Sequence, residues 1–373
     1  MIRKTAVLVL VIFLLIGLVS PSLVQAQGGL TVLVDSVVVA FPMQISFSLS
    51  ARSDVDITDI RLHYTIDRAG FAEVISEVYL EFEPAPSVDI ERALDMRKVG
   101  SLPPGAILEY WWAVSDDSGD SLETLPRMVR FDDNRYDWQV LTEGEVSFYW
   151  YQGEPSFVAE LMTAAQQALE RLAEDTGAYP QRPVRIYLYA SYSDLLGALI
   201  FPQEWTGGVA YPGYGVIAIG ISPANLDWGR RAVAHEVAHL IIHQVTSNPY
   251  NWLPTWLDEG LAMYAEGPLA TGFAAYLDRA IAGDDLISVK SLASPFSAKA
   301  EVAYLAYAQS YSLVEFLVNR YGKDKMLALL LTFGEGSGYD EALEAVYGFD
   351  MNGLNSLWRD YVTAQYQGAG VNG

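Results

Sequence analysis

Short segments in which apolar and polar residues alternate make up the early part of the chain. They lie at residues 30–41, 43–51, 59–66, 77–84, 106–116 and 127–133. This period of two is typical of strands with one buried face, and Pro-Pro-Gly at 103–105 and Ser-Gly at 118–119 supply turn signals between them. Only residues 90–98 show a weak helical period. We therefore expect residues 27–141 to form a β-sandwich of the immunoglobulin or fibronectin type III kind.

The pattern changes after residue 142. Strands are expected at 146–152, 184–190 and 216–221, and a helix begins at Pro155 and ends before Gly177. Helical spacing of apolar residues then recurs at 272–283, 300–322, 323–336, 339–348 and 354–366. The chain is thus predicted to be a multidomain protein. An all-β domain precedes an α+β domain at 142–373, which has an α/β part (142–266) and a helical part (267–373).

Residues 1–26 have the pattern of a secretory signal peptide. Arg3 and Lys4 precede an apolar run over residues 5–19, Pro21 ends that run, and Ala26 closes a small-residue cleavage site. Because the run is short for a membrane span, we expect cleavage rather than retention as an anchor. No later apolar run is long enough to predict an integral membrane segment. The expected location is extracellular or in the cell envelope.

The composition limits which kinds of partner the chain is expected to bind and which kind of organism it is expected to come from. The chain has 23 Lys and Arg against 46 Asp and Glu, a net charge of −23, and loss of Arg3 and Lys4 with the signal would leave −25. Such acidity opposes binding to nucleic acid and to anionic membrane surfaces. The chain has no Cys, which excludes disulfides and attachment of lipid to a cysteine. An exported protein without disulfides fits a bacterial source best.

The candidate metal-binding and catalytic residues are concentrated in one stretch, residues 232–266. His235 and His239 lie four residues apart in an apolar run without Pro or Gly, so a helix places both imidazoles on one face, where they can hold one Zn²⁺. Glu236 follows the first His directly and can act as a general base. The third ligand is Glu259, in a second predicted helix that begins after Pro254. Two His and one Glu leave a tetrahedral position open, as in a catalytic zinc site.

The other two histidines are not expected to bind this metal. His243 continues the helical stripe, but eight residues place its Cα about 12 Å from that of His235, too far to share an ion on a straight helix. We expect it to be a helix residue with a hydrogen-bond partner. His63 lies far upstream, in an alternating segment, and is expected on a surface strand.

The sequence HEVAH, followed twenty residues after its second His by the Glu of WLDEGLAMY, resembles the gluzincin metallopeptidases. This group includes the thermolysin and aminopeptidase N families, and the closest resemblance is to bacterial peptidase MA-like domains. The resemblance implies a zinc metallopeptidase that acts on peptides or proteins, and a gluzincin-like fold for residues 142–373. It also implies that Tyr307, in YAQSYSLVEFL, stabilises the oxyanion. Tyr311 lies one turn later on the same helix, and either phenol could serve.

The same resemblance bears on the way in which substrate binds. It implies that the strand before the zinc helix, residues 216–221, is the sheet edge that pairs with an extended substrate. The aminopeptidase N family carries a Gly-x-Met-Glu-Asn segment in this part of the chain, and its Glu recognises the free amine of the substrate. Here there is no carboxylate between Trp205 and Asn225. An endopeptidase is therefore favoured over an exopeptidase.

Two other classes of function remain open. The chain could be a catalytically degenerate peptidase fold that acts as a binding module at the cell surface. Alternatively, the β-sandwich could carry the main role as an adhesive module with its own surface partner. The intact set of His235, His239, Glu236 and Glu259 favours the enzyme.

Overall fold

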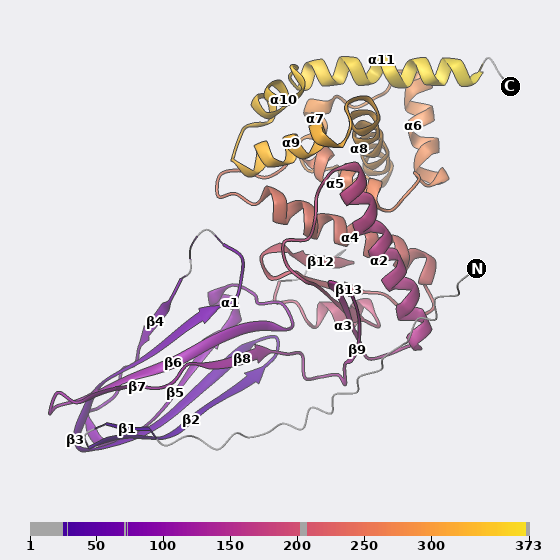
Figure 1. The fold of residues 1–373 in the computed structure, drawn as a ribbon. Coiled ribbons are helices and arrows are strands. Elements are labelled where there is room, and N and C mark those ends of the chain that lie inside the picture. Colours follow the sequence, from indigo (N-terminus) through magenta and orange to yellow (C-terminus); the bar gives the residue numbers. More distant parts are fainter. Residues whose placement is uncertain (1–24, 28, 71, 73, 202–206, 371–373) are drawn as a thin grey trace, which may run out of the picture.

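The computed structural model describes residues 25–27, 29–70, 72, 74–201 and 207–370. The chain has a β-rich region that ends at Phe131 and a second region that begins at Gln139, in which a small sheet lies below a group of helices (Figure 1). None of the helices in the described part of the chain has the length and apolar character needed to cross a membrane. The predicted signal peptide lies outside the described residues except at its end, where Gln25 and Ala26 belong to a short strand.

The β-rich region is built around one long strand. Its strands are β1 (Gln25–Gln27), β2 (Leu30–Ala40), β3 (Gln44–Ile66), β4 (Ser76–Tyr79), β5 (Ala85–Asp95), β6 (Ala106–Asp116), β7 (Ser121–Glu123) and β8 (Arg127–Phe131). The first half of β3 pairs with β2 and β5, and its second half pairs with β4 and β6. Alternate residues such as Phe47, Leu62 and Trp112 are fully buried, as expected for strands with one face on a core.

The prediction of a β-rich region is confirmed, although several of its elements differ from those expected. The segments 43–51 and 59–66 belong to one strand, because β3 continues through a register shift between Arg52 and Ile57 instead of ending at a turn. The weak helical period at 90–98 is mostly wrong. Residues up to Asp95 form β5, and only one helical turn, α1 (Met96–Val99), follows. All eight strands are hydrogen-bonded into one network, and the sandwich topology stays a prediction.

The second region begins with a five-stranded sheet in the order β12, β13, β11, β10, β9. Its elements are β9 (Gln139–Glu143), β10 (Val146–Trp150), α2 (Pro155–Asp175), β11 (Val184–Tyr189), α3 (Tyr192–Leu196), β12 (Gly208–Tyr211), the 3₁₀ turn η1 (Pro212–Tyr214) and β13 (Val216–Gly220). The three inner strands are parallel, and both edge strands are antiparallel to their neighbours. The division expected between residues 141 and 142 falls inside β9.

The strand at 216–221 is not the sheet edge that the sequence led us to expect. β13 pairs with β11 on one side and with β12 on the other, so it is an inner strand. Its residues Val216 to Ile219 are all buried, which fits a strand covered on both faces. The edge strand next to β13 is β12, whose four residues are all partly exposed. The Gly-rich sequence that forms β12 carries no alternating pattern, and the strand was therefore missed.

Helices form the rest of the molecule. They are α4 (Leu226–Thr246), α5 (Thr255–Ala265), α6 (Thr271–Gly283), α7 (Val289–Leu292), α8 (Ala300–Tyr321), α9 (Lys323–Gly334), α10 (Tyr339–Tyr347) and α11 (Met351–Gly370). The predicted helices are confirmed to within a few residues, and the short helices α3 and α7 were not expected. One hydrophobic core joins α2, α4 and the sheet to the later helices, which fixes α4 and α5 relative to each other.

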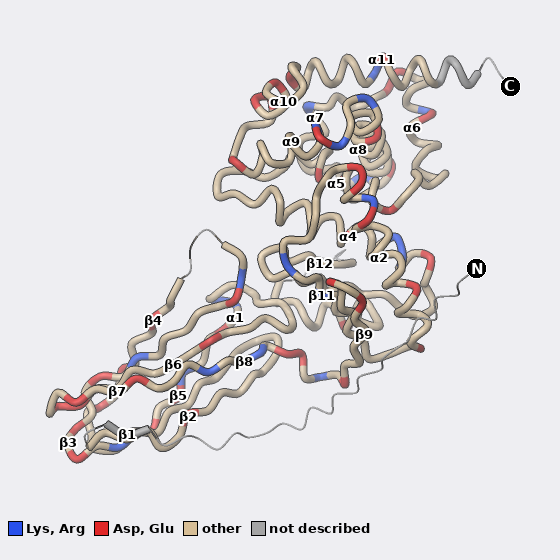
Figure 2. The backbone as a smooth tube through the Cα atoms, viewed as in Figure 1, with Lys and Arg blue, Asp and Glu red and all other residues tan. Residues whose placement is uncertain are grey.

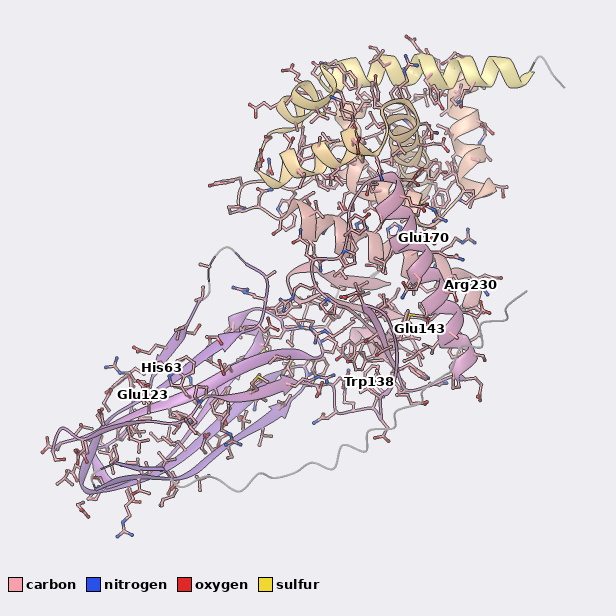
Figure 3. The ribbon with its side chains drawn as sticks, in the orientation of Figure 1. His63, Glu123, Trp138, Glu143, Glu170 and Arg230 are labelled. Carbon is pink, nitrogen blue, oxygen red and sulfur yellow. The ribbon has the colours of Figure 1, made fainter. Side chains whose placement is uncertain are left out.

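The two regions share a second core. Buried residues of the five-stranded sheet, including Tyr187, Tyr189 and Val216, belong to the same apolar cluster as the interior of the β-rich region. Trp138 lies where the regions meet, with ring contacts at 5.3 Å to both tyrosines (Figure 3). Tyr189 also donates a hydrogen bond to Asp133 at 3.0 Å. Acidic residues are spread over both regions (Figure 2).

Candidate metal centre

Helix α4 carries the first three candidate residues. Its apolar residues Val233, Val237 and Ile241 are buried, and this face packs into the core beside α2 and the sheet. His235 and His239 lie on another face, with side chains 20% and 15% exposed. The four-residue spacing puts both rings on one side of the helix, and their Nε2 atoms lie 3.1 Å apart. The sequence pattern alone was enough to predict this part of the site.

Helix α5 brings Glu259 to the two histidines. Pro254 precedes its first turn, and Trp256, Leu257 and Leu261 are fully buried on the core side. The neighbouring Gly260 faces α8, where an added Cβ would lie 2.4 Å from the carbonyl oxygen of Ser310. Close packing of α5 on α8 therefore requires glycine here, and it directs Glu259 toward α4.

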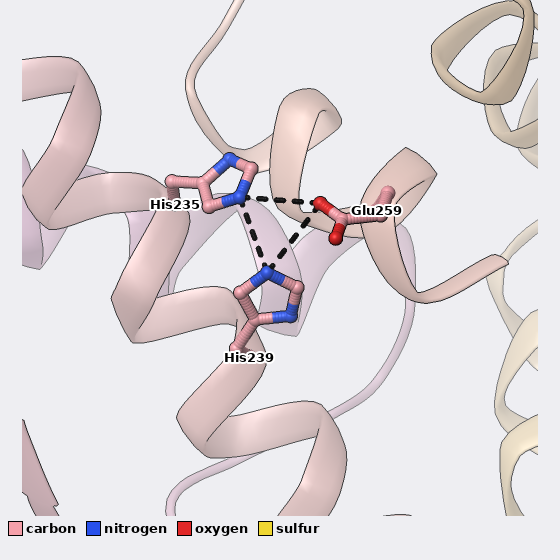
Figure 4. Close-up of side chains that lie close together, drawn as sticks. All are labelled: His235, His239 and Glu259. Carbon is pink, nitrogen blue, oxygen red and sulfur yellow. Dashed lines mark hydrogen bonds and ion pairs between the residues drawn. The ribbon is translucent and has the colours of Figure 1, made fainter. Parts of the chain in front are cut away.

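The three candidate ligands form a compact triangle (Figure 4). Glu259 Oε2 lies 3.4 Å from His235 Nε2 and 3.7 Å from His239 Nε2. This oxygen is buried and has no hydrogen-bond partner in the described part of the chain. Atoms bound about 2.0–2.2 Å from one tetrahedral ion are about 3.3–3.6 Å apart, so the donor set fits a metal such as Zn²⁺.

Two further carboxylates orient the imidazoles. His235 Nδ1 lies 2.9 Å from Glu266 Oε1, and His239 Nδ1 lies 2.9 Å from Asp258 Oδ1. These contacts leave both Nε2 atoms free to bind a metal, and carboxylates commonly play this part beside metal-bound histidines. Sequence reasoning missed both residues. Asp258 could have been found because it directly precedes Glu259, but nothing in the pattern marked Glu266.

The remaining histidines lie apart from the triangle. His243 Nε2 is 2.9 Å from Asp258 Oδ1, the oxygen that His239 also contacts. It is thus a partnered helix residue, as expected. His239, His243 and Asp258 also place one ligand atom each within 4.8 Å of one another. The nitrogen of His239 that contacts Asp258 is Nδ1, not the Nε2 of the triangle. His63 is in β3, beside Glu77 and far from α4 (Figure 3).

Contacts between the carboxylates and the imidazoles balance the charge in the site. Burial opposes ionisation of Glu259, but the two facing imidazoles lower its pKa to about 2. Burial likewise opposes protonation of His235, but contacts with Glu259 and Glu266 raise its pKa to about 9. The pKa of Asp258 falls below its usual range because the attraction of His239 and His243 exceeds the cost of burial. The carboxylates therefore favour positive charge at the centre of the triangle, which a bound cation would also supply.

Glu236 faces the edge strand. A Cβ added to Gly208, the first residue of β12, would lie 2.8 Å from both Cδ and Oε1 of Glu236. The carboxyl group therefore rests on the backbone of β12, and a larger residue at 208 would displace it. Burial raises the pKa of Glu236 above its ordinary value.

The two candidate tyrosines have different surroundings. Tyr307 packs its ring against Phe296, with centroids 5.1 Å apart. Burial raises its pKa to about 12, and the negative charges of Glu259 and Glu236 contribute. Tyr311 donates its hydroxyl to Glu315 at 3.3 Å. Of the two, Tyr307 is the one whose surroundings include the acids of the site.

Comparison with known proteins gives a family and several distant structural likenesses. A model of the Peptidase MA superfamily matches residues 164–364. A search of curated proteins gave no match. Aminopeptidase A of Legionella pneumophila, solved with aspartic acid, is 12% identical with a TM-score of 0.40, over 90% of this chain and 50% of that one. The chain therefore spans about half the length of that enzyme.

Two other structures match only parts of the chain. An inactive OgpA from Akkermansia muciniphila, in complex with an O-glycopeptide, is 16% identical over 30% of this chain and 32% of that one, with a TM-score of 0.21. The structure of a bromine derivative of BhCBM56 is 10% identical over 29% of this chain and 97% of that one, with a TM-score of 0.20. These values are too low to support an assignment, which rests on the family model. Because that model covers more than half of the chain, the protein belongs to the Peptidase MA superfamily.

Proposed function

We propose that this protein is an exported zinc metallopeptidase that hydrolyses peptide bonds within polypeptides. The observation that carries this proposal is the triangle of His235, His239 and Glu259, with sides of 3.1, 3.4 and 3.7 Å and with Glu236 on the same helix. A peptidase family and a donor set that fits a catalytic metal point to the same chemistry.

The three ligands would hold Zn²⁺ through His235 Nε2, His239 Nε2 and Glu259. When bound, zinc supplies a Lewis acid that lowers the pKa of a water molecule and polarises a carbonyl group. Asp258 and Glu266 accept hydrogen bonds from the Nδ1 atoms and so keep the Nε2 lone pairs directed at the centre of the triangle.

Glu236 is the proposed general base. Its carboxylate accepts a proton from the attacking water and later delivers that proton to the leaving amine. Tyr307 is the proposed oxyanion donor, because its surroundings include the acids of the site and its pKa of about 12 keeps the hydroxyl protonated at neutral pH. Tyr311 is engaged with Glu315 and is not assigned this role.

The edge strand β12 is the proposed substrate-binding strand. Among the described residues, β13 is its single neighbour in the sheet, so its outer side pairs with no described strand. Its first residue, Gly208, lies against Glu236, so an extended peptide paired with β12 would pass the catalytic groups. No Asp or Glu occurs between Trp205 and Asn225 to recognise a free amine, which supports an endopeptidase.

The decisive experiment is to measure zinc per chain in the purified protein, together with hydrolysis of a denatured protein substrate with and without a chelator. About one zinc per chain in the wild type, lost in both His239→Ala and Glu259→Ala, and chelator-sensitive hydrolysis would support the enzyme. Zinc binding without any hydrolysis would favour a binding module. A wild-type protein that takes up no zinc would refute the proposal.

Export is proposed from the first 26 residues, and it places the enzyme in the cell envelope or outside the cell. N-terminal sequencing of the protein secreted by a bacterial host would test this, since cleavage after Ala26 would give Gln27 as the first residue. A surface partner for the β-rich region stays a prediction.

A further inference from the structure

The turn η1 joins the edge strand β12 to β13, and it is hydrogen-bonded to the β-rich region. The backbone N–H of Ala69 donates to the carbonyl oxygen of Gly213 at 2.7 Å. A Cβ on Gly213 would lie 3.2 Å from the carbonyl oxygen of Ala69, so the two backbones are in close contact. Ala69 follows β3 by only a few residues, and its neighbour Asp67 is bonded to Ile107 of β6. The contact therefore comes from an anchored part of the β-rich region.

Two arginines reinforce this contact. Arg182 donates through Nη1 to Gly213 at 2.8 Å and pairs through Nη2 with Asp67 at 2.5 Å. Arg185 donates through Nη1 to Gly105 at 2.7 Å and through Nη2 to Tyr214 at 2.9 Å. Each guanidinium thus bridges the turn and the β-rich region. Guanidinium groups suit this task because they present several donors in a fixed plane.

The turn is also linked to the helix that carries the metal ligands. Gln244, one residue after His243 on α4, donates to the carbonyl oxygen of Pro212 at 3.2 Å. At the other end of β12, Gly208 lies against Glu236. Both ends of the four-residue strand region thus contact α4, and the turn also contacts the β-rich region.

We propose that the β-rich region positions the edge strand β12 for substrate through Asp67, Ala69 and Arg182. This inference rests on the proposed function of β12 as the substrate-binding strand. A four-residue strand with one neighbour holds its shape poorly by itself, because half of its backbone groups lack a partner in the sheet. Fixing the turn before substrate arrives reduces the entropy that is lost when a peptide pairs with the strand. The β-rich region is then part of the enzyme and not only an attached module.

The kinetic test uses Asp67→Ala and Arg182→Ala with two substrates. One is a fluorogenic peptide of about ten residues, which can pair along β12, and the other is a short chromogenic amide that reaches little beyond the scissile bond. We expect KM for the long peptide to rise about tenfold in Arg182→Ala, and less in Asp67→Ala, which leaves the bond to Gly213 in place. Zinc content and kcat/KM for the short amide should stay within about twofold of the wild type. Arg182→Lys, which can keep one of the two bonds, should give an intermediate KM.

Arg359→Ala is the matched control. It removes an ion pair of similar length, 2.6 Å to Asp284, in the helical part of the molecule. Unchanged KM in this control and a selective effect in the Arg182 variant would support the proposal. Equal losses on both substrates would overturn it, since they would indicate general damage to the site.

A second measurement does not depend on activity. Hydrogen–deuterium exchange should become faster over residues 208–220 in Arg182→Ala and Asp67→Ala, and it should stay unchanged over the same residues in Arg359→Ala. If exchange over residues 208–220 does not change in the Arg182 and Asp67 variants, the β-rich region does not hold the strand and the inference is wrong. If the wild type hydrolyses no peptide, the proposed function fails, whereas this exchange comparison still decides whether the strand is held.

Discussion

His243 and Asp258 form a contact of 2.9 Å, and Asp258 uses for it the oxygen that also contacts His239. Because the lowered pKa of Asp258 keeps it ionised, both imidazoles donate to it. His243 is thus linked to His239, a proposed metal ligand, through one carboxylate, although it lies too far along α4 to join the triangle. The proposed function, this relay and the packing of α5 on α8 lead to five predictions.

Removing the relay should weaken metal binding without abolishing it. His243→Leu leaves Asp258 with one imidazole donor, and we expect the dissociation constant for Zn²⁺ to rise by about 10-fold or more, within the range found for groups that orient metal ligands. Competition with a chromophoric chelator would measure it. His63→Gln, which changes a histidine in the β-rich region, is the control, and an unchanged affinity in His243→Leu would count against the relay.

Glu236→Gln should separate metal binding from catalysis. The amide keeps the size of the side chain but cannot accept the proton, so kcat should fall by about 100-fold or more while zinc per chain stays unchanged. Metal analysis and hydrolysis would be measured on the same preparation. Loss of zinc in this variant would show that Glu236 supports the metal rather than acting as the base.

The two tyrosines should differ in their effect on turnover. Tyr307→Phe should lower kcat by about 10- to 100-fold with little change in KM, since the hydroxyl would act when charge develops on the substrate oxygen. Tyr311→Phe should stay within about twofold of the wild type, because that hydroxyl is bonded to Glu315. The reverse order would transfer the role to Tyr311.

Gly260→Ala should destabilise the protein. The new Cβ would lie 2.4 Å from the carbonyl oxygen of Ser310 and 2.8 Å from Cγ2 of Val314, and α5 would have to move away from α8. We expect a loss of about 1–3 kcal/mol in the free energy of unfolding. A Cβ added at Gly272 in α6 would meet no described atom within 4 Å, so Gly272→Ala should not lose stability. Thermal unfolding of the two variants side by side would measure the difference.

Removal of the metal should lower stability as well as activity. Zinc at about 100 times its dissociation constant would stabilise the folded state by about 2.7 kcal/mol if the unfolded chain does not bind it. Treatment with a chelator should therefore lower the melting temperature, and added Zn²⁺ should restore it. His239→Ala should show neither change. A wild-type melting temperature that does not respond to zinc would argue against a bound metal.

The sequence by itself determined the elements that have a strong local pattern. Spacing along α4 placed His235 and His239 on one helical face, and the periodicity of apolar residues predicted α2, α8 and most strands. These features follow from the geometry of a single helix or strand, which neighbouring residues dictate.

Only the tertiary structure decided the features that depend on pairing between distant segments. The weakly patterned Gly-rich stretch became the edge strand β12 because β13 was available to pair with it, and the apparent helical period near residue 90 gave way to pairing of β5 with β3. Glu266, Asp258 and the turn contacts of Arg182 likewise come from elements brought together by packing. Such contacts leave no periodic signal in one sequence, because each joins residues that are far apart along the chain or that face each other only once the helices have docked.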